Sequence, residues 1–127
     1  AWTLDYRPDF TAKETGLDTF IDWDKDFVGK NFAKKDESKN KLTPLIVETN
    51  DIDVTNNEAV LKNGKAIGYV TSGGFAHFTN KSVAFSYLDS REINSEKGIQ
   101  VEINGDLFNS SVIKSPLYDP TGQKMRS

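Results

Sequence analysis

Apolar and polar side chains alternate along much of the second half of the chain, as they do in strands that bury one face. Val83, Phe85 and Tyr87 alternate with small side chains, and Val101 and Ile103 alternate with polar ones. Runs of this length, bounded by turn residues, predict strands rather than helices. We predict six strands, at residues 44–48, 58–62, 65–72, 81–88, 98–103 and 106–115.

Two Asn-Gly pairs, Asn63-Gly64 and Asn104-Gly105, each separate two predicted strands. Both residue types accept the positive φ angles of a tight hairpin turn, so these pairs predict hairpins. Several short antiparallel strands in a small domain suggest a barrel or a sandwich, and closure into a barrel would leave no exposed sheet edge. The expected fold class is all-β: a six-stranded antiparallel Greek-key-like barrel with a short mixed strand and helix lead-in.

The first third of the chain mixes polar turns with short apolar groups. Residues 19–23 alternate like a strand, and residues 28–35 are typical of a short helix. The charged run at residues 34–41 is most simply a solvated connector. We therefore divide the chain into a lead-in and connector, residues 1–41, and a barrel domain, residues 42–127.

The length and net charge of the chain limit its number of domains and the kinds of molecule that it is expected to bind. A chain of 127 residues suits one domain, and eight Phe, four Tyr and two Trp can supply much of its buried surface. Sixteen basic and nineteen acidic residues give a net charge of −3, so nucleic acid is not expected as a partner. Neither a membrane span nor a signal peptide is visible, and without cysteine there is no disulfide frame. A cytoplasmic location is expected.

The single histidine, His77, lies in a strand-like stretch near Phe75 and Phe78. A histidine can act as a general base or a metal ligand. No second histidine completes a usual metal set, and no G-x-S-x-G pattern marks a serine nucleophile. We expect a surface or partly buried histidine, no catalytic residue and no metal site.

The stretch Thr71-Ser72-Gly73-Gly74 has the small residues that let backbone N–H groups converge on a phosphate. It lacks the lysine and the strand-to-helix context of a phosphate-binding loop. A bend or bulge in a barrel strand is the better interpretation.

Asp22, Asp24 and Asp26 alternate with Trp23 and Lys25. The glycine and the distal glutamate of a calcium loop are missing from this stretch. The three carboxylates therefore indicate the solvated end of a strand rather than a metal site.

Residues 116–122 form a stiff terminal segment, because its two prolines have a fixed φ and restrict the residues before them. Such a segment could dock on a neighbouring domain or close the barrel. Both alternatives stay open at this point.

Five stretches, taken in order, resemble one family. They are Ala1-Trp2 with Glu14-Thr15-Gly16-Leu17, the run from Asp26 to Lys30, the run from Asn63 to Gly74, Lys81-Ser82-Val83-Ala84, and Pro116-Leu117-Tyr118-Asp119-Pro120. The set is similar to the C-terminal part of the glycine cleavage T-protein family and covers nearly the whole chain. Its ending is most similar to the dimethylglycine and sarcosine dehydrogenase branch.

In that family a folate-binding part precedes a C-terminal β-barrel, and tetrahydrofolate accepts a one-carbon unit. The resemblance implies that the catalytic aspartate and the main pterin-binding residues precede Ala1. It leaves Thr19, at a place where relatives can carry an aromatic next to the folate, and Tyr118 as the folate contacts of this chain. FAD belongs to a separate N-terminal domain in the dehydrogenase members. The implied partners are the folate-binding part and, in that branch, the flavin domain.

The expected function is that of the C-terminal barrel module of a folate-dependent aminomethyltransferase-type enzyme, inactive alone. The donor would be dimethylglycine, sarcosine or a glycine-derived aminomethyl group, and the choice among them stays open. The start at Ala1 rather than Met, together with the single histidine, suggests a fragment. The alternative is a non-catalytic protein-interaction or assembly barrel, because function depends on sites and not on the fold. An upstream reading frame with a dinucleotide-binding motif would favour the enzyme.

Overall fold

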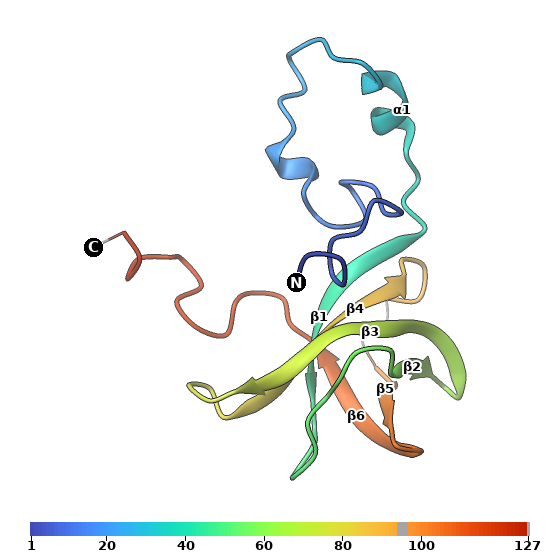
Figure 1. Ribbon diagram of the computed structural model, residues 1–127, viewed down its shortest axis with the longest axis vertical. Helices are drawn as coiled ribbons and strands as arrows, with labels where there is room; N and C mark the ends of the chain where they lie inside the picture. The colour runs from blue at the N-terminus through green and yellow to red at the C-terminus, as the bar shows by residue number, and fades with distance from the viewer. Residues whose placement is uncertain (94–96, 127) are drawn as a thin grey trace.

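The computed structural model describes residues 1–93 and 97–126, and most of them belong to a closed barrel of antiparallel strands with a lead-in above it (Figure 1). The order around the barrel is β1-β4-β3-β2-β5-β6, with β6 paired back to β1. β2, β3 and β4 are sequential neighbours, and β1 lies beside β4, which is a Greek-key arrangement. The predicted fold class is confirmed. The strands are β1 (Asn40–Val47), β2 (Ala59–Lys62), β3 (Lys65–Ala76), β4 (Lys81–Asp89), β5 (Ile99–Ile103) and β6 (Asp106–Val112).

Both Asn-Gly pairs form the predicted two-residue hairpin turns. The φ angles are 51° at Asn63 and 77° at Gly64, and 53° at Asn104 and 91° at Gly105. Two successive positive φ angles define a type I′ turn, whose twist matches that of the flanking strands. The β2–β3 and β5–β6 connections are therefore determined locally by their turn residues.

β3 runs four residues further than predicted and passes through the glycine-containing stretch. Its pairing with β4 changes register between Val70 and Ser72, so that Thr71 is the extra residue of a β-bulge, as predicted. The strand-like placement of His77 was wrong. Ala76 pairs with Lys81, and the residues between them, His77 included, form the turn of the β3–β4 hairpin.

The core of the barrel consists of inward-facing aliphatic side chains. Every second residue of β5, and of β1 from Thr43 on, is buried, as the alternation in the sequence requires. Each such side chain contributes roughly 1.5–3 kcal/mol of transfer free energy. The most deeply buried aliphatic side chains are those of Leu45, Val47, Val54, Val60, Val70, Leu88, Ile99, Val101 and Ile103.

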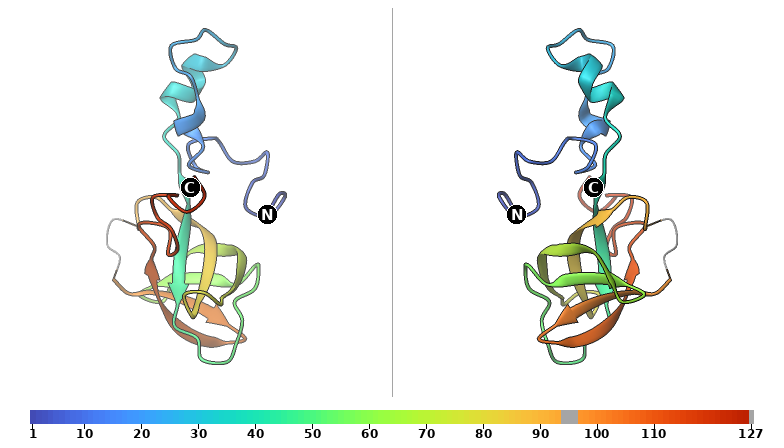
Figure 2. Two further views of the ribbon diagram at one scale, coloured as in Figure 1. Left: turned by 90° about the vertical axis from the view of Figure 1, so that its left-hand side faces the viewer. Right: turned by 90° about the vertical axis from the view of Figure 1, so that its right-hand side faces the viewer.

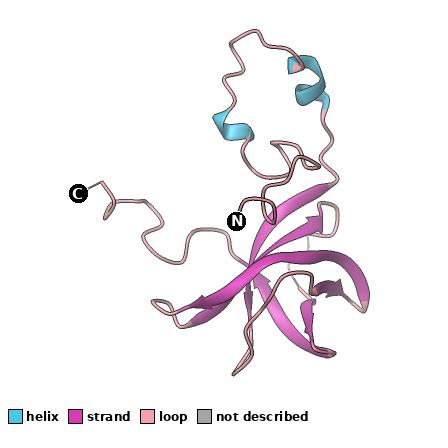
Figure 3. Ribbon diagram, in the orientation of Figure 1, coloured by secondary structure: helices cyan, strands magenta, loops and turns pink. Residues whose placement is uncertain are grey.

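The lead-in is an open ring of loops with two short helices, η1 (Asp18–Phe20) and α1 (Lys30–Lys35) (Figures 2 and 3). The strand predicted at residues 19–23 is wrong. Among the described residues no strand lies beside this segment, and the Phe20 N–H instead donates to the Leu17 carbonyl at 3.0 Å. A strand needs a neighbour for its backbone groups, whereas a single helical turn satisfies them locally.

The predicted helix is confirmed in a shorter form, because Gly29 has a φ of 88° and α1 begins at the next residue. The connector prediction was partly wrong, since β1 begins at Asn40 inside the charged run. The division of the chain at residue 41 stays a prediction. Neither helix in the described part of the chain has the length and apolar character needed to span a membrane.

Candidate functional site

Asp5 is a buried carboxylate, 3% exposed, where the lead-in meets the barrel. Its Oδ1 accepts hydrogen bonds from the Thr71 hydroxyl and, at 2.7 Å, from the Ser72 hydroxyl. Successive side chains of a regular strand point to opposite faces, but the bulge at Thr71 lets both hydroxyls reach one carboxylate. The anion that this small-residue stretch binds is therefore the carboxylate of Asp5, a residue of the same chain.

Tyr87 holds the same lead-in segment from β4. Its hydroxyl donates to the Asp5 carbonyl oxygen at 2.7 Å, and its ring stacks on Phe10 with 3.6 Å between the ring centres. Burial, and to a smaller extent the neighbouring Tyr69 and Glu14, raise the pKa of Tyr87 to about 12. The residue therefore stays a neutral hydrogen-bond donor at neutral pH.

Glu14 fixes the start of β1. Its Oε2 accepts the Thr11 N–H at 3.1 Å while the Thr11 hydroxyl accepts the Glu14 N–H at 3.2 Å, which is the reciprocal pattern of a capping box. Its Oε1 accepts the Asn40 N–H at 3.0 Å, and its carbonyl oxygen accepts the Leu42 N–H at 2.8 Å. In the sequence, Glu14 stood out only as part of a stretch that resembles the family. The spacing Thr11-x-x-Glu14 was the local signal for this role.

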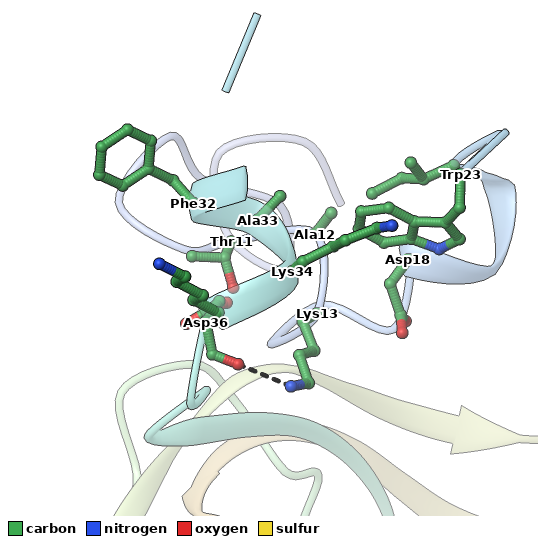
Figure 4. Close-up of a pocket in the computed structure, with 11 residues that line it drawn as sticks. Thr11, Ala12, Lys13, Asp18, Trp23, Phe32, Ala33, Lys34 and Asp36 are labelled. Atoms are coloured by element: carbon green, nitrogen blue, oxygen red, sulfur yellow. Dashed lines mark hydrogen bonds between the residues drawn. The ribbon is translucent and has the colours of Figure 1, made fainter. Parts of the chain in front are cut away.

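A cavity of about 710 Å³ opens between α1 and the loop before it (Figure 4). Trp23 and Phe32 are among the residues that line it, and the Lys34 Nζ lies 6.0 Å from the centre of the Trp23 ring. At the base, the Lys13 Nζ donates to the Asp36 carbonyl oxygen at 2.6 Å. A mostly apolar lining with a few charged side chains is the usual composition of a pocket for a small ligand.

The lead-in leaves several large apolar side chains uncovered. Trp2, Phe20, Val28 and Phe32 are each at least 80% exposed, and α1 buries none of its residues. Exposed apolar side chains of this size on one segment are typical of surfaces that contact another polypeptide, a membrane or a ligand.

The model of the glycine cleavage T-protein C-terminal barrel domain family matches residues 40–119, from the first residue of β1 to beyond the end of β6. The match covers more than half of the chain. The chain belongs to this family. The resemblance proposed from the five sequence stretches is therefore confirmed, and its barrel is the T-protein barrel.

Curated relatives extend the likeness beyond the T-protein barrel into the lead-in. Human mitochondrial dimethylglycine dehydrogenase is 32% identical over 133 aligned positions, which cover 99% of this chain and 15% of that protein. The aminomethyltransferase of Thermotoga petrophila is 36% identical over 110 positions, or 83% of this chain and 29% of that protein. The chain thus spans less than a third of either relative.

A solved structure supports the same fold. The glycine cleavage system aminomethyltransferase T of Bartonella henselae matches with a TM-score of 0.80, covering 92% of this chain and 34% of that one. Its sequence identity is 23%, so this likeness concerns the fold alone.

The two folate contacts predicted from the resemblance lie on separate segments. Thr19 is exposed in η1, whereas Tyr118 belongs to the segment after the T-protein barrel. The Tyr118 ring meets Phe78 edge-on with 4.3 Å between centres, and the Lys124 Nζ lies 4.9 Å from the centre of the Tyr118 ring. The terminal segment does not close the barrel, because β6 pairs directly with β1.

The remaining sequence candidates have local partners. Asp22 Oδ1 accepts the Asp24 N–H at 3.1 Å, and the Lys25 Nζ lies 3.8 Å from the other oxygen of Asp22. The exposed His77 ring lies edge-on to Phe75 at 5.0 Å. Within residues 1–93 and 97–126, no three acidic or histidine side chains gather closely enough to hold a metal ion.

Proposed function

We propose that this chain is the C-terminal barrel module of a folate-dependent aminomethyltransferase-type enzyme. In that enzyme a one-carbon unit passes from dimethylglycine, sarcosine or a glycine-derived aminomethyl group to tetrahydrofolate. The supporting observation is the similarity to dimethylglycine dehydrogenase over 99% of the chain, lead-in included. Asp5, Glu14 and Tyr87 join the first part of the lead-in to the barrel by hydrogen bonds, so the likeness includes the contact between the two.

The module has a supporting role in this proposal and is inactive alone. The catalytic and main pterin-binding residues belong to the upstream part, and FAD, where the parent enzyme has it, belongs to a further N-terminal domain. The exposed apolar side chains of the lead-in agree with such a larger assembly. Packed against the folate-binding part, the barrel forms one wall of the cleft and excludes water from a reactive iminium.

Tyr118 and Thr19 are the contacts with folate that we propose within this chain. Tetrahydrofolate combines ring systems with a carboxylate-bearing tail. The half-exposed Tyr118 ring, the Phe78 ring beside it and the charge of Lys124 form a surface suited to an aromatic ring followed by a carboxylate. Thr19 would contribute a hydroxyl from the lead-in.

Titration calorimetry with 5-formyl-tetrahydrofolate tests how the folate site is divided between this chain and the upstream region. Micromolar affinity corresponds to about 8 kcal/mol, and each missing charge-assisted hydrogen bond removes roughly 1.5–3 kcal/mol of that. The isolated chain should bind in the millimolar range or not detectably, and micromolar binding should return with the upstream region. Tight binding by the isolated chain would show that its own residues form the site.

A turnover assay tests the activity itself. Formaldehyde and methylene-folate are measured with dimethylglycine, sarcosine and glycine as donors. We expect no turnover from the 127-residue chain and turnover from the longer polypeptide. Product formed by the isolated chain would contradict the proposal. The cytoplasmic location stays a prediction. The human dimethylglycine dehydrogenase is mitochondrial, so cell fractionation is needed to distinguish the two locations.

A further inference from the structure

The outer face of β4 is only half covered by the lead-in. Tyr87 and Phe85 lie two residues apart and therefore point to the same side of the sheet. Phe10 covers Tyr87, which is 1% exposed, whereas Phe85 is 46% exposed. The interface between the lead-in and the barrel therefore covers Tyr87 but leaves the aromatic ring of Phe85 exposed.

The uncovered part of this face forms an apolar groove of about 440 Å³. Its walls include Val83 and Phe85 on one side and Ile113 and Leu117 of the terminal segment on the other. A second hollow of about 290 Å³ lies over the end of β3 and shares Val83 and Phe85 with the groove. The end of the β3–β4 hairpin projects from the barrel (Figure 1), and Phe75 and Phe85 are 39% and 46% exposed.

The start of the chain is linked to the second hollow through Asp5 and Ser72. Ser72 lines that hollow and is the strand partner of Phe85, and its hydroxyl donates to Asp5 at 2.7 Å. The Asp5 N–H donates to the Ala1 carbonyl oxygen at 2.9 Å, so Ala1 lies next to the same residue. A polypeptide that continued upstream of Ala1 would therefore leave the lead-in beside this apolar surface.

We propose that the groove lined by Val83, Phe85 and Leu117 is the docking surface for the upstream part of the same polypeptide, which would lay apolar side chains into it. The inference rests on the proposed function, in which this chain is one module of a longer enzyme. The chain covers 34% of the solved aminomethyltransferase, so the relatives have ample polypeptide to fill such a groove. Interfaces between domains of one chain typically cover about 600–1,500 Å² and bury partly apolar surfaces of this kind.

Thiol labelling tests the proposal, because the chain contains no cysteine. Phe85→Cys reports on the groove. Leu107→Cys is the matched control, since Leu107 is 51% exposed on β6. Each variant is labelled with a maleimide in the 127-residue chain and in the polypeptide that carries its natural upstream region, and labelling is read peptide by peptide by mass spectrometry.

In the longer polypeptide we expect labelling of Phe85→Cys to slow by about tenfold or more and labelling of Leu107→Cys to stay unchanged. Equal rates at position 85 in the two proteins would overturn the proposal. Slow labelling in the isolated chain that depends on its concentration would also overturn it, because a second copy would then occupy the groove. Hydrogen exchange of β4 in the unmodified proteins gives the same readout without a substitution. If β4 is protected in a longer polypeptide that shows no turnover, the docking proposal stands and the proposed function fails.

Discussion

Gly73 of β3 lies so close to Val54 that a β-carbon at position 73 would come within 2.3 Å of the Val54 carbonyl oxygen. Val54 is 1% exposed and belongs to the long connection between β1 and β2. The connection therefore packs on bare strand backbone, and only glycine leaves room for it.

Gly73→Ala should lower the free energy of unfolding by about 1–3 kcal/mol, because the contacting atoms are backbone and cannot rotate away. Gly74→Ala is the matched control, since a β-carbon there meets nothing within 4 Å. The control should stay within about 0.5 kcal/mol of the unmodified protein. Denaturant melts measure the free energy of unfolding of the two variants. Equal stabilities would show that the β1–β2 connection shifts easily to make room for the added methyl group.

Asp5→Ala should loosen the lead-in, since it removes the carboxylate that accepts from the Ser72 hydroxyl and one of the two acceptors of the Thr71 hydroxyl, which also donates to the Phe85 carbonyl oxygen. The loss of hydrogen bonds to a charged acceptor costs about 1.5–3 kcal/mol. Limited trypsin digestion should cut the lead-in lysines faster while the barrel resists. Asp9→Ala is the control, because the Asp9 ion pair with Arg7 is exposed. If both variants resist trypsin equally, Asp5 does not hold the lead-in.

Tyr87 makes stability depend on pH in the alkaline range. Its pKa is raised from 10.0 to about 12 by burial, so the folded protein disfavours the phenolate that the unfolded chain forms more easily. The resulting stability is complete below pH 10 and is lost as the pH rises toward 12. Its size is at most about 2–3 kcal/mol.

Tyr87→Phe should remove this part of the pH dependence and lower stability at neutral pH, because the Asp5 carbonyl oxygen loses its donor. Urea melts between neutral pH and strongly alkaline pH measure both the pH dependence and the stability at neutral pH. Parallel pH curves for the two proteins would mean that Tyr87 titrates normally in the folded state.

Gly64→Val should destabilise the β2–β3 hairpin through backbone strain alone. The φ angle at Gly64 is 77°, and no atom lies within 4 Å of a β-carbon placed there. A β-branched residue in the left-handed region costs roughly 1–2 kcal/mol. Gly64→Asn, which tolerates positive φ, should cost less. A neutral Gly64→Val in a denaturant melt would contradict the type I′ turn.

Much of the barrel was predictable because its signals are local. Alternation located all six strands, and Asn63-Gly64 and Asn104-Gly105 located two of the turns. Errors arose where the conformation depends on a distant neighbour. Residues 19–23 alternate like a strand but have no described strand beside them, and Asn40 and Lys41 join the sheet through β4, where Glu14 accepts the Asn40 N–H.

The sequence by itself determined two of the hairpins, the all-β class and the family, because φ preferences, side-chain alternation and motif order are properties of short stretches. Only the tertiary structure decided what those stretches contact. Asp5 and Thr71 are 66 residues apart, and neither alternation nor spacing indicates that the bulge and the lead-in carboxylate meet. The groove beside Phe85 is likewise formed by strands and a terminal segment that are distant in sequence. Such contacts depend on how the whole barrel closes, since each is made only after elements far apart in the chain have packed together.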